Sequence, residues 1–123
     1  MNKFQDLIVY QKAIKFGSQI RRTTKTFPND ELYVLSAQFK RAADSIILNI
    51  AEGAGNSSKR EFSKFLDYSI RSCFECIGCA DIAIANKFID DKSYTSITGS
   101  ANELIAMLYG LQKSLFKKKA IEV

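Results

Sequence analysis

Residues 94–115 read YTSITGSANELIAMLYGLQKSL. Their apolar side chains recur at alternating steps of three and four, giving a seam of Tyr94, Ile97, Ala101, Leu104, Leu108, Leu111 and Leu115. Because an α-helix turns once in about 3.6 residues, this spacing places the seam on one helix face, which is typical of a helix packed in a bundle. Gly99 and Gly110 interrupt the pattern, and we expect close approach of a neighbouring helix to compensate for their low helix propensity.

Three earlier segments carry the same periodicity. It predicts helices over about residues 7–26, 31–52 and 58–87, before a fourth that runs from about residue 91 to a basic tail at residues 117–119. Strand patterns are missing, and short loops favour antiparallel neighbours. We therefore expect an all-α protein, an antiparallel up-down-up-down four-helix bundle, in a single domain over residues 1–123.

The helix ends and inner faces follow from residue type. Pro28 ends the first helix, Asn29 or Asp30 caps the second, and Gly53 and Gly55 end the second through the left-handed conformation that glycine tolerates. The expected inner faces of the first three helices are Val9, Ala13, Phe16, Ile20 and Thr24, then Leu32, Leu35, Phe39, Ala42, Ala43, Ile46 and Ile50, then Phe62, Phe65, Leu66, Ile70, Cys73, Ile77, Ala80 and Ile84.

The chain contains no long uncharged apolar run, and its first twelve residues, MNKFQDLIVYQK, lack the apolar core and cleavage site of a signal peptide. We therefore expect no membrane association and a cytoplasmic location. Three cysteines cannot all pair within one chain, so we expect reduced thiols.

Positive charge is concentrated at the start of the chain. Residues 1–29 hold six basic residues and one acidic residue, whereas the remaining residues carry equal numbers of both. Such a one-sided surface favours a polyanionic partner, and the alternative is a solvated helix face that serves solubility. The candidate nucleic-acid-binding residues are Lys12, Lys15, Arg21, Arg22 and Lys25.

Cys73, Cys76 and Cys79 have a spacing similar to part of an iron–sulfur ligand set. Position 83, where a fourth cysteine would complete it, is Ala83, and the chain has no histidine. Steps of three also spread the thiols from the core face toward an outer face. We therefore expect small buried hydrophobic side chains, with no metal and no other cofactor.

The loop at residues 52–60, EGAGNSSKR, combines glycines, a helix start and two cations, which invites a phosphate-binding interpretation. It departs from the Walker sequence, and a glycine stop followed by a capping box of Ser58 and Glu61 explains every residue, so we favour that interpretation. The chain has no histidine, and no carboxylates or thiols stand at a spacing that would indicate a catalytic pair. The sequence therefore predicts a protein that is not an enzyme.

A second stripe follows steps of three and four outside the inner faces of the second and third helices. Mixed polar and apolar residues at such spacing favour a subunit interface, although scattered apolar surface residues are an alternative. We expect Arg41 to pair with Glu75 across helices or subunits. The stripe comprises Val34, Gln38, Arg41, Ser45, Leu48 and Glu52, then Tyr68, Ser72, Glu75, Cys79 and Ile82, with Ile8 and Ile14 from the first helix.

Several short motifs carry a resemblance to a known family. They are residues 4–13 (FQDLIVYQKA), 27–28 (FP), 31–33 (ELY), Gln38, 41–43 (RAA), 45–46 (SI), 49–53 (NIAEG), 61–62 (EF), 65–66 (FL), Ser72 and Glu75. Together they resemble the four-helix bundle protein family, first noted as bacterial proteins encoded in intervening sequences of large-subunit ribosomal RNA genes. The resemblance covers roughly the first 85 residues.

The resemblance implies a left-handed up-and-down bundle, commonly assembled as a homopentamer, without known enzymatic activity and without catalytic residues to carry over. A relative, the accessory variability protein of diversity-generating retroelements, works with a reverse transcriptase and binds nucleic acid through a basic surface. Tyr10 stands where the family usually has tryptophan, and the cysteine cluster is unusual for it.

Two functions follow as expectations. The first is a homo-oligomer that binds structured RNA or DNA mainly through phosphates, since the sequence shows no aromatic stacking motif. The alternative is a structural or protein-interaction scaffold whose basic helix binds an acidic protein partner or only aids solubility.

Overall fold

The computed structural model describes residues 4–55 and 58–117. Over these ranges the secondary structure is entirely helical, so the predicted all-α class is confirmed. The elements are the short 3-10 helix η1 (Phe4–Asp6), α1 (Ile8–Thr24), the 3-10 helix η2 (Asn29–Glu31), α2 (Leu35–Ala54), α3 (Lys59–Ala85) and α4 (Asp91–Leu115). None of the helices in the described ranges is long and apolar enough to cross a membrane.

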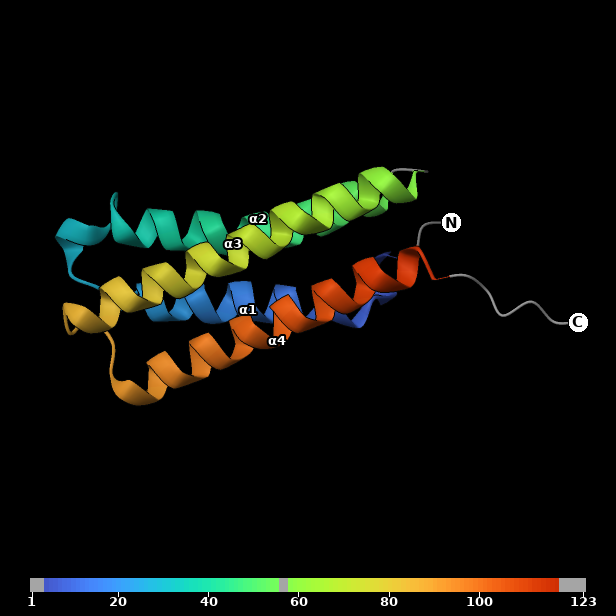
Figure 1. Cartoon of the computed structure of the whole chain (residues 1–123). Helices are drawn as coiled ribbons and strands as arrows, with labels where there is room; N and C mark the ends of the chain where they lie inside the picture. Colours follow the sequence, from blue (N-terminus) through green and yellow to red (C-terminus); the bar gives the residue numbers. More distant parts are fainter. Residues whose placement is uncertain (1–3, 56–57, 118–123) are drawn as a thin grey trace, which may run out of the picture.

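The long helices lie side by side as a bundle (Figure 1). The turns that join α1 to α2 and α3 to α4 lie at one end, whereas α2 ends and α3 begins at the opposite end. Packing is most extensive between α2 and α3, followed by α3 with α4, α1 with α2, and α1 with α4. Each helix thus contacts two neighbours around the bundle. The left-handed twist remains a prediction.

Two helix starts are capped by side chains. Ser58 Oγ accepts a hydrogen bond from the Glu61 backbone N–H at 3.2 Å, as the predicted capping box requires. Asp90 Oδ1 accepts a hydrogen bond from the Ser93 backbone N–H at 2.8 Å. Hydrogen bonding from Ser93 holds the pKa of the Asp90 carboxyl below its ordinary value. Both caps satisfy backbone donors that a helix cannot pair internally.

The predicted start of α2 is wrong. Residues 29–31 form η2, and Val34 adopts φ −116° and ψ −97°, outside the helical region, so that α2 begins at Leu35 without a side-chain cap. Neither Asn29 nor Asp30 therefore caps α2. The break also turns Leu32 away from the inner face of α2, and Leu32 is exposed rather than buried.

The roles predicted for the glycines are also corrected. Gly53 lies inside α2, and Gly55, which ends it, has φ −74°, so neither is left-handed. Gly53 instead permits close packing, because a Cβ there would lie 2.7 Å from the Phe65 Cβ. A Cβ at Gly99 or Gly110 would meet nothing within 4 Å, so these glycines do not mark close approach of a helix.

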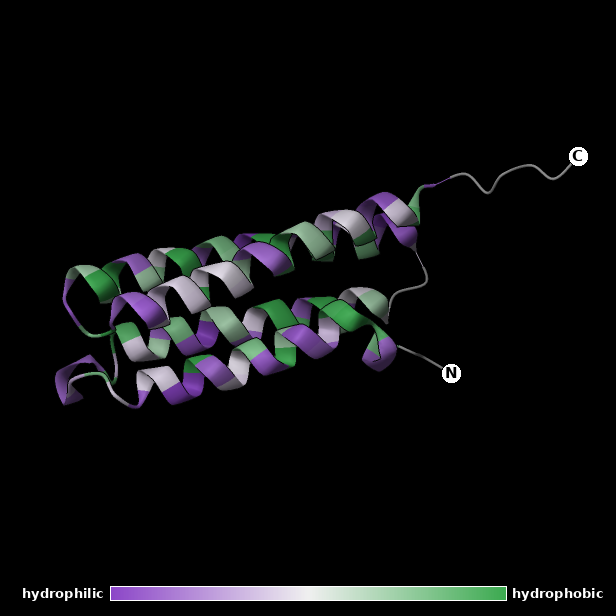
Figure 2. Cartoon of the chain, turned by 90° about the horizontal axis from the view of Figure 1, so that it is seen from below, coloured by the Kyte–Doolittle hydropathy of each residue, from purple (hydrophilic) through white to green (hydrophobic). Residues whose placement is uncertain are grey.

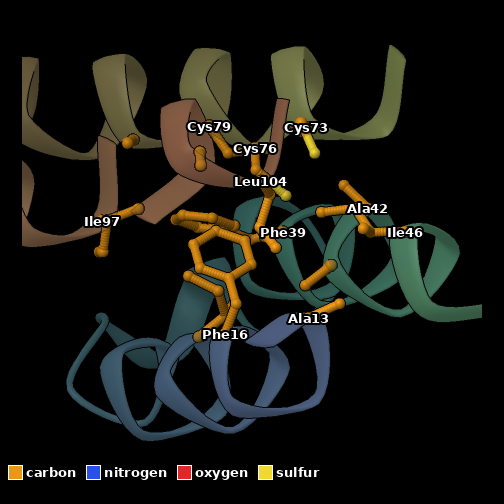
Figure 3. Packing of buried hydrophobic residues seen from close by; sticks show 14 of the residues in the cluster. Ala13, Phe16, Phe39, Ala42, Ile46, Cys73, Cys76, Cys79, Ile97 and Leu104 are labelled. Atoms are coloured by element: carbon orange, nitrogen blue, oxygen red, sulfur yellow. The ribbon is translucent and has the colours of Figure 1, made fainter. Parts of the chain in front are cut away.

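The core forms where the apolar faces meet. Hydrophobic and hydrophilic residues alternate along every helix (Figure 2). Side chains from all four α-helices converge in Figure 3, with Phe16 of α1 and Phe39 of α2 lying between the ribbons. The expected inner faces of α1 and α2 are buried apart from Leu32, and α4 buries Ile97, Ala101, Leu104 and Leu108 of its predicted seam.

The inner face of α3 is rotated relative to the one predicted. Leu66, Ile70, Cys73 and Ala80 are buried as expected, whereas Phe62, Phe65, Ile77 and Ile84 are only half-buried. Ser69 and Ser72 are buried instead, because this flank of α3 packs against α2. Ser69 Oγ donates to the Ile46 carbonyl at 2.9 Å, and Ser72 Oγ lies 2.9 Å from Ser45 Oγ. These bonds pair polar groups that burial would otherwise leave without partners.

The three cysteines are free and buried, as small hydrophobic residues would be. The expectation that they spread to an outer face is wrong, because all three belong to the buried core and Cys79 is only 4% exposed. Burial raises the pKa of the Cys73 thiol from 9.0 to about 12 and that of Cys79 to about 11, and it raises the pKa of Cys76 further. All three thiols therefore stay protonated in the folded protein at neutral pH.

We predict opposite effects for two glycine substitutions. Gly53→Ala should lower the free energy of unfolding by about 1–3 kcal/mol, because the new methyl group overlaps Phe62 and Phe65. Gly99→Ala, the matched control, should raise it by about 0.5–1 kcal/mol, because alanine favours the helix and the methyl group meets open space. Urea unfolding measures both, and a stabilising Gly53→Ala would contradict the close packing.

A second prediction concerns pH. Below pH 9 the thiols are protonated in both states, whereas above it the unfolded chain ionises them and the folded protein does not. The free energy of unfolding should therefore fall as pH rises from 9, by up to about 1.4 kcal/mol per pH unit for each thiol. Urea unfolding of Cys76→Ala under reducing conditions should show a shallower fall, and an unchanged slope would contradict the burial of this thiol.

Candidate functional site

The five candidate nucleic-acid-binding residues all lie on α1, but they do not form one patch. The core face of α1 is turned inward, and the cations occupy its two flanks. Lys12, Lys15 and Arg22 line a groove between α1 and α4, whereas Arg21 and Lys25 line another between α1 and α2. The sequence could not assign the flanks, because that requires knowing which neighbour packs on each side.

The α1/α4 groove has a volume of about 250 Å³ and is open to solvent. Its walls also carry Gln19 of α1 and Glu103 of α4, and Gln19 Nε2 donates to Ser96 Oγ at 3.0 Å. Lys12 Nζ lies 3.3 Å from Glu103 Oε1. Both side chains are about half exposed, and such pairs contribute little stability, so Lys12 can exchange Glu103 for another anion. The full lining is Lys12, Lys15, Phe16, Gln19, Arg22, Ser100, Glu103 and Leu104.

The α1/α2 groove, about 320 Å³, has its arginine firmly paired. Both terminal nitrogens of Arg21 donate to the Asp44 carboxylate at 2.7 Å, and these hydrogen bonds with the carboxylate charge raise the pKa of Arg21. Asp44 thus already occupies the bidentate donor pair of Arg21. Lys25 and Lys40 remain as cations in this groove. Sequence reasoning missed Lys40 because it lies on α2, outside the basic amino-terminal segment.

Metal and phosphate sites find little support. No group of three or more histidine, cysteine or acidic side chains that could hold a metal occurs in residues 4–55 and 58–117. The Ser58 cap agrees with the interpretation of residues 52–60 as a helix stop and a new helix start. Residues 56–57 of that loop lie outside the described residues.

The apolar members of the predicted interface stripe are exposed. Val34 and Leu48 on α2 are each 63% exposed, and Ile82 on α3 is 51% exposed. Ile8 and Ile14 are exposed on α1. Large apolar side chains that face solvent at regular helical spacing are available to a protein partner.

Five polar members of the stripe form hydrogen bonds with one another. Ser45 and Ser72 form the hydrogen bond described above, and Ser72 is largely buried. Gln38 Nε2 donates to Glu75 Oε2, and Arg41 Nη1 donates to Gln38 Oε1 at 3.4 Å. The direct pairing of Arg41 with Glu75 within the chain is therefore wrong, because Gln38 lies between the two charges. Pairing between subunits remains a prediction.

Exposed aromatic side chains were missed by the sequence analysis. Phe74, Tyr109 and Phe116 are each more than half exposed on α3 and at the end of α4. Each directly follows a residue of an expected apolar face, and a step of about 100° turns it away from the core. A position one residue after an inner-face residue was therefore the feature of the sequence that could have identified these exposed rings. Exposed aromatic rings are therefore present on α3 and α4, although the sequence shows no stacking motif.

Comparison with known proteins gives a consistent assignment. The model of the 23S rRNA-intervening sequence protein family matches residues 5–110. A crystal structure of a protein of unknown function from the S23 ribosomal protein family of Bacteroides thetaiotaomicron is similar, with a TM-score of 0.80 and 25% sequence identity, covering 86% of this chain and 99% of that one. No curated protein matches the chain. Since the family model spans all four α-helices up to residue 110, this chain belongs to the 23S rRNA-intervening sequence protein family.

Proposed function

We propose that this protein is a non-enzymatic homo-oligomer, pentameric as the family resemblance implies, that binds RNA or DNA through the basic surface of α1. The observation that carries the nucleic-acid proposal is the gathering of Lys12, Lys15 and Arg22 in the α1/α4 groove. The exposed apolar side chains of α2 and α3 support self-association.

The chemistry of the α1/α4 groove suits a phosphodiester backbone. Lysine and arginine attract phosphate without regard to base sequence, and the side chains of Gln19 and Ser100 add hydrogen-bonding groups. The groove is open rather than enclosed, so a continuous polymer can pass across it. Binding would therefore recognise backbone and shape more than base identity.

Assembly would strengthen a weak single-subunit site. Each chain carries a net charge of +5, and a ring of five would carry about +25. Several grooves on one particle raise the effective concentration of phosphates once the first contact forms. Each phosphate contact releases condensed counterions, so affinity would fall steeply with salt.

The structure ranks the five candidate cations. Lys15 and Arg22 are exposed in the groove, and Lys12 is held only by an exposed ion pair with Glu103. Arg21 is bound to Asp44 through two short hydrogen bonds and should contribute less. The expected contributions of these cations to phosphate binding therefore differ, whereas the sequence alone treats the cations of α1 as equivalent.

The test is salt-titrated binding to a structured RNA and to duplex DNA, with the oligomeric mass measured by light scattering. Replacing Lys12, Lys15 and Arg22 by glutamine should make the dependence of log K on log salt shallower by about 3 for each subunit that engages duplex. Replacing Lys59, Lys64 and Lys92 by glutamine removes the same charge from α3 and α4 and is the matched control.

An equal effect of the two triple variants would contradict a role for the α1/α4 groove and leave only non-specific attraction to a basic protein. No binding at low salt would eliminate the nucleic-acid function and favour the scaffold alternative. In that case the exposed apolar surface of α2 and α3 would be the functional feature.

A further inference from the structure

The first turn of α2 has backbone donors without partners. Because Val34 is not helical and its side chain has no oxygen, α2 starts without a side-chain cap. The backbone hydrogen bonds of α2 begin with the Gln38 N–H, which donates to the Val34 carbonyl at 3.0 Å. The preceding N–H groups, those of Leu35, Ser36 and Ala37, donate to no acceptor in the described ranges. These three donors lie at the positive end of the helix dipole, where anions bind.

Ser36 adds a buried hydroxyl at the same place. It is only 3% exposed, and it lines the α1/α2 groove. Its hydroxyl forms no hydrogen bond with any residue that the structure describes, whereas the other buried hydroxyls there, those of Thr24, Ser69 and Ser72, all have acceptors. Fully enclosed side-chain polar atoms in the described ranges all have partners, so the Ser36 oxygen is one that the groove still reaches. A ligand in the groove would pair it.

Two cations stand beside this hydroxyl. Lys25 of α1 and Lys40 of α2 line the groove, and neither makes an ion pair with another described residue. Lys40 follows Ser36 after about one helical turn, so the two lie on the same face of α2. Arg21 already neutralises Asp44, and the acidic side chains of η2 do not line the groove. The local charge therefore favours an anion.

The remaining wall of the groove is suited to an apolar group. Leu32 is 47% exposed and lines the groove, and the Thr24 hydroxyl is engaged with the Ile20 carbonyl at 2.9 Å. The groove volume of about 320 Å³ lies at the lower end of the range for small-molecule sites, about 300–1,000 Å³. A ligand with an anionic head and a small apolar body matches this division of the surface.

We propose that the α1/α2 groove binds a small phosphate monoester at the start of α2. The phosphate accepts hydrogen bonds from the three N–H groups and from the Ser36 hydroxyl, the two lysines supply the countercharge, and the organic group packs on Leu32. Phosphate is favoured over carboxylate because its three terminal oxygens offer more acceptors to this set of donors. This site goes beyond the proposed function, since it lies on the other flank of α1 from the α1/α4 groove.

NMR titration of the full chain locates the ligand. Phenyl phosphate should shift the backbone amide resonances of Leu35, Ser36 and Ala37 in a saturable manner. Inorganic phosphate, which lacks the apolar body, should shift the same amides with weaker affinity. The absence of saturable shifts at these amides with both probes would overturn the site. Equal affinities would overturn the ester and assign the site to free phosphate.

Ser36→Ala separates ligand binding from a structural role. Because the hydroxyl has no partner among the described residues, its removal should not lower the free energy of unfolding. The affinity for phenyl phosphate, measured by calorimetry, should fall about tenfold or more, because a hydrogen bond to a charged group is lost. Ser63→Ala removes a half-buried serine hydroxyl on α3, outside the groove lining, and should leave the affinity unchanged. An unchanged affinity in Ser36→Ala would overturn the proposed site.

Charge removal gives an independent readout. Lys25→Gln combined with Lys40→Gln should weaken phenyl phosphate binding about tenfold or more and make it less sensitive to salt. Lys64→Gln combined with Lys92→Gln removes the same charge from α3 and α4 and should have little effect. An equal loss in both double variants would overturn a localised site, because it would show attraction to the net charge alone.

Discussion

The register between α2 and α3 is the constraint on which the rest of this structure depends. Their contact is the most extensive in the bundle, and it is held by close packing at Gly53 and by buried hydrogen bonds from Ser69 and Ser72. A shift of one residue along either helix would rotate side chains by about 100° and leave the Ser69 hydroxyl without its carbonyl partner. The same register aligns the outward side chains. Core packing and surface pattern are therefore two consequences of one helix pairing.

The neighbouring helices decide which cations of the basic helix α1 remain available to bind an anion. The sequence alone gives no reason to distinguish its cations as anion-binding residues, but the bundle places α2 on one side of α1 and α4 on the other. Asp44 of α2 accepts two hydrogen bonds of 2.7 Å from Arg21, whereas Glu103 of α4 accepts a single one of 3.3 Å from Lys12. Each groove thus keeps two cations that make no ion pair in the described part of the chain, Lys15 and Arg22 in the α1/α4 groove and Lys25 and Lys40 in the α1/α2 groove. The grooves differ in how firmly the third cation is held.

Sequence reasoning failed mostly at helix ends and at small residues. Leu32 has the apolar character of a core residue, yet the non-helical backbone at Val34 turns it outward. Glycine was interpreted through its conformational freedom at Gly53 and Gly55, but the relevant property at Gly53 is the missing side chain. Ser69 and Ser72 are polar and are nevertheless buried, where they form hydrogen bonds with α2. In each case the outcome depends on a neighbouring helix, which no local pattern describes.

By itself, the sequence determined the helical class, the approximate extent of each helix, the inner faces of α1 and α2, the capping box at Ser58 and the concentration of positive charge on α1. These features follow from local periodicity and from hydrogen bonds between residues close in the chain. Only the tertiary structure decided which cations share a groove and that Gln38 separates Arg41 from Glu75. These features depend on how distant helices pack, because side-chain proximity across a bundle is set by interhelical register and not by position along one helix.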